Sequence, residues 1–225
     1  IFTKLDTLDL GSYTFTIDAQ DVATQFFNEN TKGTLQYLDI HSVTSLSPVF
    51  GFERNILFTN YEALKEIKLN SEGTTISANE FKGCVALEKV EGVVKMGTAA
   101  SAFEGASTAV KAQPTINMAG SVIPAKAFKD TKIKDIKVDG KVVLPTAIGA
   151  SAFEGNTAIA ELDLKSATTI GANAFNGATA FKGIGKNGVV TLNVATVEEN
   201  SFNGTAVQRF QLKAATTVKA NSLNS

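Results

Sequence analysis

The sequence predicts a mainly β solenoid, in which one elongated domain over residues 1–225 is built from short coils that each contain a strand and a short helical turn. This prediction depends on two recurring phrases, one rich in alanine around a phenylalanine and one with alternating apolar residues. The first phrase reads IGASAFEG at residues 148–155 and IGANAFNG at residues 170–177. Self-similarity at a fixed period indicates a repeat architecture, whose neighbouring repeats share one continuous core.

The aromatic residue of the first phrase gives the period of the array. Looser copies occupy residues 76–83, 123–130 and 197–204, and the aligned positions of the regular repeats follow one another at intervals of 21 to 27 residues. Intervals of this size are typical of short solenoid coils, so we expect regular repeats over residues 61–225, degenerate repeats in residues 1–60, and about eight or nine repeats in all. The aligned positions are Phe81, Phe103, Phe128, Phe153, Phe175, Phe202 and Leu223, with Phe27 and Phe50 marking the degenerate copies.

Small residues around the aromatic predict how each coil turns. Alanine usually lies three residues before the aromatic and directly before it, as Ala150 and Ala152 do before Phe153, and alanine favours helical backbone. Glycine usually lies two residues after the aromatic, as Gly155 does, where it suits a left-handed residue that ends a helical turn. Asp130 takes this place once, and Asp tolerates the left-handed conformation better than most residues. We expect the phenylalanines to form a buried ladder along the solenoid.

The second phrase follows the aromatic and predicts a strand. In residues 35–40, 64–69, 133–138, 159–164 and 207–212 apolar residues alternate with polar ones, which is typical of a strand with one buried face. The polar side chains then line an outer column, and solenoids use such faces for extended binding. A solvated face with opposite charges paired across strands is the alternative interpretation. The candidate binding face comprises Tyr37, Asp39, Glu66, Lys68, Asp135, Lys137, Glu161, Asp163, Arg209 and Gln211, and its column also includes His41, Asn70, Lys165 and Lys213.

Three repeats carry insertions with the chemistry of β-hairpins. Residues 138–142 contain Asp-Gly and residues 186–189 contain Asn-Gly, and both dipeptides favour tight hairpin turns. Residues 90–93 carry a weaker version of the same signal. We interpret the three segments as hairpin insertions on one edge of the solenoid, which add to the candidate binding surface.

Composition and charge exclude several classes of protein. The 225 residues are 44% hydrophobic and 19% charged, which is a globular rather than a disordered composition. With 21 basic and 22 acidic residues the net charge is −1, so the chain lacks the basic surface of a nucleic-acid-binding protein. No apolar run approaches the length of a membrane span. The first residue is Ile rather than Met, which indicates a processed or trimmed chain.

No residue set predicts catalysis, a metal or a cofactor. His41 is the only histidine and Cys84 is the only cysteine, so no internal disulfide can form. About two strand spacings of roughly 4.8 Å separate His41 from Cys84. This distance exceeds the hydrogen-bond reach that a nucleophile and its base need. We expect Cys84 to be a small buried apolar residue. The glycines of residues 183–188 lie where a hairpin turn is expected, not before a helix, so they do not predict a phosphate site.

The chain resembles a known repeat family. Residues 76–90, which read ISANEFKGCVALEKV, look like the BspA-type leucine-rich repeat, and residues 162–181 resemble it equally well. The chain departs from the pattern because the cysteine occurs once and Glu80 stands where alanine is expected. The resemblance implies a right-handed leucine-rich-repeat solenoid from a secreted or surface-anchored bacterial protein, often of Bacteroidetes-like organisms. Such proteins are associated with adhesion to host proteins, and no catalytic residue comes with the family.

We therefore expect a non-enzymatic recognition or adhesion module at the bacterial cell surface or outside the cell, which binds a protein or glycan partner through the strand face and the hairpin insertions. A structural spacer or stalk within a larger surface protein is the main alternative, and an accessory domain of a carbohydrate-active enzyme is another. The sequence leaves the oligomeric state open. The last repeat ends near Leu223 without a clear polar cap. Solenoid ends normally need a cap, so we expect this end to be truncated or packed against a neighbour.

Overall fold

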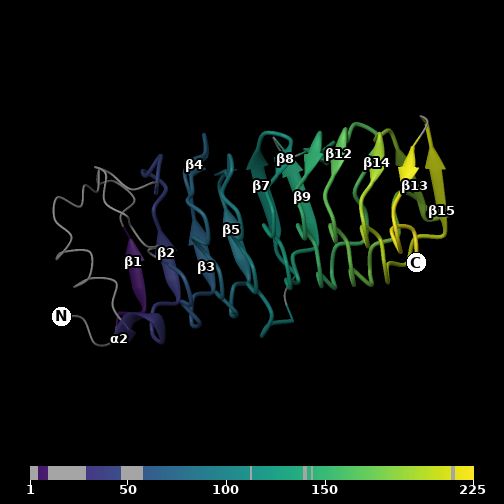
Figure 1. Cartoon of the computed structure of the whole chain (residues 1–225). Helices are drawn as coiled ribbons and strands as arrows, with labels where there is room; N and C mark the ends of the chain where they lie inside the picture. Colours follow the sequence, from purple (N-terminus) through teal and green to yellow (C-terminus); the bar gives the residue numbers. More distant parts are fainter. Residues whose placement is uncertain are drawn as a thin grey trace.

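The computed structural model is a row of stacked coils that follow one another in sequence order (Figure 1). The structure describes residues 5–9, 29–46, 58–111, 113–138, 141–142, 144–213 and 216–225. Within these ranges the regular structure is strand, apart from one short helix, α2 (Glu29–Lys32). The prediction of a mainly β solenoid is therefore confirmed, whereas the handedness of its coils stays a prediction.

The second sequence phrase builds a first column of parallel strands. The apolar middle residues are in register, since Leu38 pairs with Leu8 on one side and with Ile67 on the other, and Ile67 pairs with Val90. Because side chains alternate along a strand, this register stacks the apolar residues inside and the polar residues outside. The column contains β1 (Thr7–Asp9), β2 (Tyr37–Asp39), β3 (Glu66–Lys68), β5 (Lys89–Glu91), β7 (Thr115–Ala119), β9 (Asp135–Val138), β13 (Val189–Leu192) and β15 (Arg209–Leu212).

A second column of two-residue strands precedes the phenylalanine turns. Ile148 pairs in parallel with Ile123 and Ile170, which places one buried isoleucine or valine of each coil above the next. The last residues of β7 also join this column, because Met118 pairs with Val94. The column contains β4 (Thr74–Thr75), β6 (Val94–Lys95), β8 (Val122–Ile123), β11 (Ala147–Ile148), β12 (Thr169–Ile170), β14 (Thr196–Val197) and β16 (Thr217–Val218).

The repeated phenylalanines form the centre of the core. All six are fully buried, at 0% exposure, and each ring stacks on the ring of the next coil, with centroids 5.0–5.9 Å apart. Such aromatic pairs add about 0.5–1.5 kcal/mol beyond the area that they bury. The predicted buried ladder is confirmed. Its members are Phe81, Phe103, Phe128, Phe153, Phe175 and Phe202.

The backbone around each phenylalanine forms tight turns in place of the expected helical turn. The glycine after the aromatic is left-handed as predicted, as in Gly155 (φ 66°), and Asp130 in the same position has φ 53°. However, the residue two before the aromatic is also left-handed, as in Ser151 (φ 57°). A left-handed residue inside the phrase interrupts a right-handed helix, so the prediction of helical turns is wrong. Asparagine often occupies this earlier position, as in Asn79 and Asn173, and it tolerates the conformation better than most residues.

Alternate N–H groups of these turns bind the next coil. In the coil of Phe153, the N–H groups of Ser151, Phe153 and Gly155 donate to three carbonyl oxygens of the coil of Phe175, at 2.8–2.9 Å. The same three bonds recur at each of the other five ladder phenylalanines, with lengths of 2.7–3.2 Å. The turns therefore form a third column of hydrogen-bonded backbone, although no strand lies there.

Phe58 belongs to the ladder, and the sequence analysis missed it. Its ring is buried and stacks on Phe81 with a centroid distance of 5.8 Å. The signal was present, because Phe58 precedes Phe81 by 23 residues and Asn60, with φ 59°, takes the position of the left-handed glycine. Phe27 and Phe50 lie outside the described residues.

The three predicted hairpin insertions have different outcomes. β9 pairs in antiparallel fashion with β10 (Lys141–Val142), which confirms the first. The second is reduced to a single antiparallel bridge between Ile184 and Val189. The third is wrong, because residues 90–93 join two strands, β5 and β6, that each pair in parallel with strands of neighbouring coils. That segment is a corner of the coil and not an excursion from it.

The ladder predicts a large and local effect of removing one ring. Phe153→Ala should lower the free energy of unfolding by about 3–5 kcal/mol, because the side chain is fully buried between two other rings. Val122→Ala is the control, since Val122 is 50% exposed, and a change below about 0.5 kcal/mol is expected. Urea denaturation measures both. Hydrogen exchange should rise mainly in the coils that contact Phe153, and a uniform rise along the chain would contradict nearest-neighbour stability.

Close stacking of the coils predicts that some glycines cannot carry a side chain. A Cβ on Gly171 would lie 2.5 Å from the backbone nitrogen of Ala150, whereas a Cβ on Gly33 would meet no atom within 4 Å. Gly171→Ala should lower the free energy of unfolding by about 1–3 kcal/mol, because the backbone of the adjacent coil must move. Gly33→Ala should change it by less than about 0.5 kcal/mol. Urea denaturation measures both changes. Equal changes in the free energy of unfolding for the two variants would show that the spacing of the coils does not exclude a side chain at residue 171.

Candidate binding face

The parallel register places the predicted polar residues on one surface. Tyr37 lies opposite Glu66, and Asp39 lies opposite Lys68. In both strands the middle residue is buried while its two neighbours point outward. The polar positions of the first strand column therefore share one outer face, which we call the strand face.

The N-terminal part of the strand face is a network of paired charges. Lys68 Nζ lies 3.0 Å from Asp39 Oδ2, and His41 Nδ1 lies 2.5 Å from Asp39 Oδ1. In the next coil Lys89 Nζ contacts Glu66 at 3.7 Å. This pairing is what the interpretation as a solvated sheet face predicts. Tyr37, which is 42% exposed, offers the large apolar surface in this region.

The carboxylate of Asp39 is held in its charged form by its neighbours. Partial burial acts to raise the pKa of Asp39, but hydrogen bonds with His41 and Lys68 outweigh this effect and leave the pKa below its ordinary value. The same hydrogen bond with Asp39 raises the pKa of Lys68. A carboxylate with this environment stabilises the fold and is a poor proton donor at neutral pH.

The polar side chains in the middle of the strand face make few hydrogen bonds with neighbouring coils. Asp135 and Lys137 project from β9, and Thr115 Oγ1 donates to Asp135 Oδ2 at 3.4 Å. Asp135 is exposed, whereas Lys137 is half-buried. These two predicted residues lie on the same face as the network of paired charges, and among the described residues they make no hydrogen bond or ion pair with it.

The coil of residues 159–164 departs from the predicted strand. Its apolar residues are buried as the phrase requires, but the segment forms no strand. Lys182 donates its N–H to the carbonyl oxygen of Ala160 at 3.0 Å, and the chain then leaves the column at Gly183, which has φ 81°. It returns at Val189, where β13 pairs with β15. The predicted strand has no partner on either side, because β9 already pairs with β7 and β10 and the following coil leaves the column at residues 183–188.

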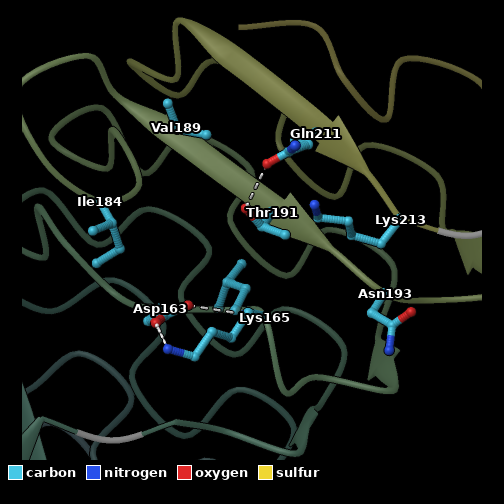
Figure 2. A pocket seen from close by; sticks show the side chains of 9 residues that line it. Asp163, Lys165, Ile184, Val189, Thr191, Asn193, Gln211 and Lys213 are labelled. Carbon is cyan, nitrogen blue, oxygen red and sulfur yellow. Dashed lines mark hydrogen bonds and ion pairs between the residues drawn. The ribbon is translucent and has the colours of Figure 1, made fainter.

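The insertion leaves an open hollow of about 630 Å³ on the strand face (Figure 2). Leu164, Ile184 and Val189 supply its apolar surface, and Ile184 is 40% exposed. A volume of this size is typical of ligand sites. Polar side chains from three successive coils complete the lining, namely Asp163, Lys165, Thr191, Asn193, Gln211 and Lys213.

The hollow unites part of the predicted face and adds residues that the sequence analysis missed. Asp163 and Gln211 meet there, whereas Glu161 pairs with Lys182 at 3.3 Å and does not line the hollow. Arg209 is exposed on β15 beside it. The sequence analysis missed four of the residues that line the hollow, namely Ile184, Val189, Thr191 and Asn193. The Asn-Gly insertion that creates the hollow was the available signal for them.

Charge is less fully paired here than at the N-terminal part of the strand face. Lys165 Nζ lies 2.9 Å from Asp163 Oδ2, and Thr191 Oγ1 donates to Gln211 Oε1 at 3.4 Å. Among the described residues, Lys213 has no ion-pair partner. The hollow therefore combines exposed apolar surface, amide groups and one unpaired positive charge.

The remaining chemistry of the described residues gives no catalytic arrangement. Cys84 is buried as predicted, and burial raises the pKa of its thiol to about 12, so it is not a nucleophile at neutral pH. In the described ranges, no three His, Cys, Asp or Glu side chains gather as they would around a metal ion. No helix in the same ranges has the length and apolar character needed to cross a membrane.

Stacked coils with a parallel strand column and a polar outer face define this chain as a solenoid repeat protein. The model of the BspA type leucine rich repeat region matches residues 8–108, 33–144 and 98–224, with six copies, and the chain belongs to this family. No curated protein and no solved structure matches the chain. Repeats of this family are typical of bacterial surface proteins, commonly bind other proteins, and are generally non-enzymatic.

The charge network at Asp39 predicts a pH-dependent contribution to stability. Asp39→Asn keeps a hydrogen-bond acceptor but removes the charge, and it should lower the free energy of unfolding at pH 7 by up to about 1 kcal/mol. Because the pKa of Asp39 is lowered in the folded state, this stabilisation is present above the unfolded pKa of about 3.9. It is lost as the pH falls through the folded pKa.

Urea denaturation of the wild type and Asp39→Asn between pH 7 and pH 2.5 measures this difference. The exposed Glu72→Gln is the control, since its carboxylate has no ion pair within the described residues. A difference between wild type and Asp39→Asn that stays constant with pH would contradict the prediction.

Proposed function

We propose that this chain is a non-enzymatic recognition module of a bacterial surface protein, and that it binds a protein partner through the strand face. The hollow lined by Asp163, Ile184 and Lys213 is the main contact. The observation that carries the proposal is the convergence of three coils on this hollow, with exposed apolar surface beside an unpaired lysine. Adhesion to a host protein is the role that we propose for this contact.

The lining of the hollow indicates what the partner presents. Ile184 and Val189 offer apolar surface to an apolar side chain, and full burial of such a side chain contributes about 1.5–3 kcal/mol. Lys213 offers a positive charge to a carboxylate, and the amides of Asn193 and Gln211 offer hydrogen bonds to a peptide backbone. The open shape suits a protruding loop of a protein rather than an enclosed small molecule.

A structural spacer is a second candidate, and the paired charges around Asp39 and Glu66 favour it for the N-terminal coils. A spacer needs a soluble face without unpaired groups, and those coils fit this description. The two roles can coexist in one chain, because the network and the hollow lie in different coils.

The experiment is a binding screen of the purified chain against extracellular matrix proteins and against a glycan array. We expect a matrix protein to bind, and we expect Lys213→Glu or Ile184→Asp to weaken that binding by at least about tenfold. Both side chains are exposed, so the fold should be retained, which circular dichroism checks.

Lys126→Glu is the matched control, because it reverses one exposed lysine on the phenylalanine turns instead of the strand face. Its binding should equal that of the wild type. Binding to glycans alone would overturn the choice of a protein partner. Equal loss in Lys126→Glu and Lys213→Glu, or no loss in either, would exclude the hollow as the contact.

A further inference from the structure

The hollow interrupts the backbone hydrogen bonds between two neighbouring coils. In a regular coil, the carbonyl oxygen of Lys65 and the N–H of Leu69 both bind the following coil, at 2.8–3.1 Å. In the coil that borders the hollow, Ala160 is the equivalent of Lys65, and its carbonyl oxygen still accepts a bond from the following coil at 3.0 Å. Leu164 is the equivalent of Leu69, and among the described residues its N–H has no acceptor. The bonds between the two coils therefore begin normally and stop where the hollow lies.

Leu162 lacks backbone partners on the same side of its coil. Successive residues of an extended chain direct their peptide groups to opposite neighbours, so Leu162 and Leu164 face the same coil. Leu162 is buried, and within the described ranges neither its N–H nor its carbonyl oxygen makes a hydrogen bond. Buried peptide groups without a partner are costly and rare. This side of the hollow therefore presents peptide groups that a bound molecule can satisfy.

The opposite side of the hollow is an edge of β13. This strand pairs with β15 on its other edge, where the carbonyl oxygen of Leu192 accepts from the N–H of Lys213 at 2.9 Å. Thr191, which precedes Leu192, directs its peptide group away from β15 and toward the hollow. Val189 faces the same way, but its peptide group is occupied by the bridge to Ile184. Thr191 is therefore the residue of β13 whose peptide group stays open on this side, as far as the described chain shows.

Two sets of open peptide groups thus border one space, with Asp163 marking one side and Thr191 the other (Figure 2). An open strand edge is a template for pairing with a further strand. Extended peptides bind proteins in this way, since main-chain bonds supply affinity and side-chain contacts select the sequence. A helix cannot pair with such an edge, because its own peptide groups are already bonded to one another.

We propose that the partner inserts an extended peptide segment into the hollow as an added strand, whose peptide groups pair with those of Thr191 and Leu162. This inference rests on the recognition function proposed above and names the form in which the partner is bound. An apolar side chain of the segment lies against Ile184 and Val189, and a carboxylate of the segment reaches the ammonium group of Lys213.

The competing occupant of this space is the chain itself. Direct pairing of β13 with residues 160–164 would satisfy the same peptide groups and close the hollow. The insertion argues against closure, because Gly183, with φ 81°, turns the chain out of the strand column. The bridge between Ile184 and Val189 then occupies the start of the edge along which the two segments would pair.

The test selects short linear peptides from a phage-displayed library on the immobilised full chain, and hydrogen exchange by NMR then follows the amides of Leu162 and Thr191. Without peptide we expect both amides to exchange fast. A saturating selected peptide should slow them by at least about tenfold, and Phe153, whose N–H already donates to the next coil, should not change. Protection of Leu162 and Thr191 in the free chain, a selection that yields no binder, or binding without slowed exchange would each overturn the proposal.

Two changes remove the proposed bonds without altering a side chain that contacts the peptide through charge. Thr191→Pro removes the N–H that faces the hollow, and proline is tolerated where a strand edge faces away from its sheet. It should weaken peptide binding by at least about tenfold, whereas the matched control Thr191→Val retains the N–H and should bind as the wild type does. A peptide methylated at its central backbone nitrogens tests the same bonds on the unaltered chain, and its binding should also weaken by at least about tenfold.

The outcomes separate this inference from the proposed function. Normal binding by Thr191→Pro and by the methylated peptide, together with weakened binding of the matrix protein by Lys213→Glu, would overturn the added strand and leave recognition through side chains. Slowed exchange at Leu162 with the selected peptide, together with unchanged binding of the matrix protein by Lys213→Glu, would support the peptide site and overturn the proposed contact with that protein.

Discussion

The hydrogen bonds between the phenylalanine turns are the constraint on which the other features depend. In every coil whose three N–H groups donate to the next coil, the residues two before and two after the aromatic are left-handed, as Ser151 and Gly155 are. These bonds fix the spacing of the coils, and at that spacing the phenylalanine rings stack at 5.0–5.9 Å. The repeated alanines follow from the same spacing, because larger side chains would hold the coils apart.

The same constraint explains where the chain can vary. The longest interval, between Phe175 and Phe202, contains the insertion at residues 183–188, yet the two rings remain 5.2 Å apart and their turns keep all three bonds. The extra residues are accommodated on the strand side, where residues 159–164 have no pairing partner in the following coil and β10 occupies the edge of β9. The hollow is therefore a product of an insertion that the turn column tolerates, and its lining can change without loss of the core.

Sequence patterns predicted the features that depend on local chemistry and missed those that depend on neighbouring coils. The buried ladder and the outward strand residues follow from periodicity alone. Alanine beside Phe153 suggested a helical turn, but helix propensity is a weak preference, and three bonds to the next coil outweigh it. Residues 159–164 carry a complete strand phrase and form no strand, because a strand needs a partner. Phe58 escaped notice because asparagine replaces the glycine that marks the other turns.

The strand β15 forms one wall of the hollow. Its residues alternate, so Gln211 and the adjacent Lys213 line the hollow, while Leu212 lies in register with the buried Leu192. Substitutions at the outward positions of β15 therefore change the lining of the hollow while the register with β13, which stacks Phe210 on Val190 and Leu212 on Leu192, is kept.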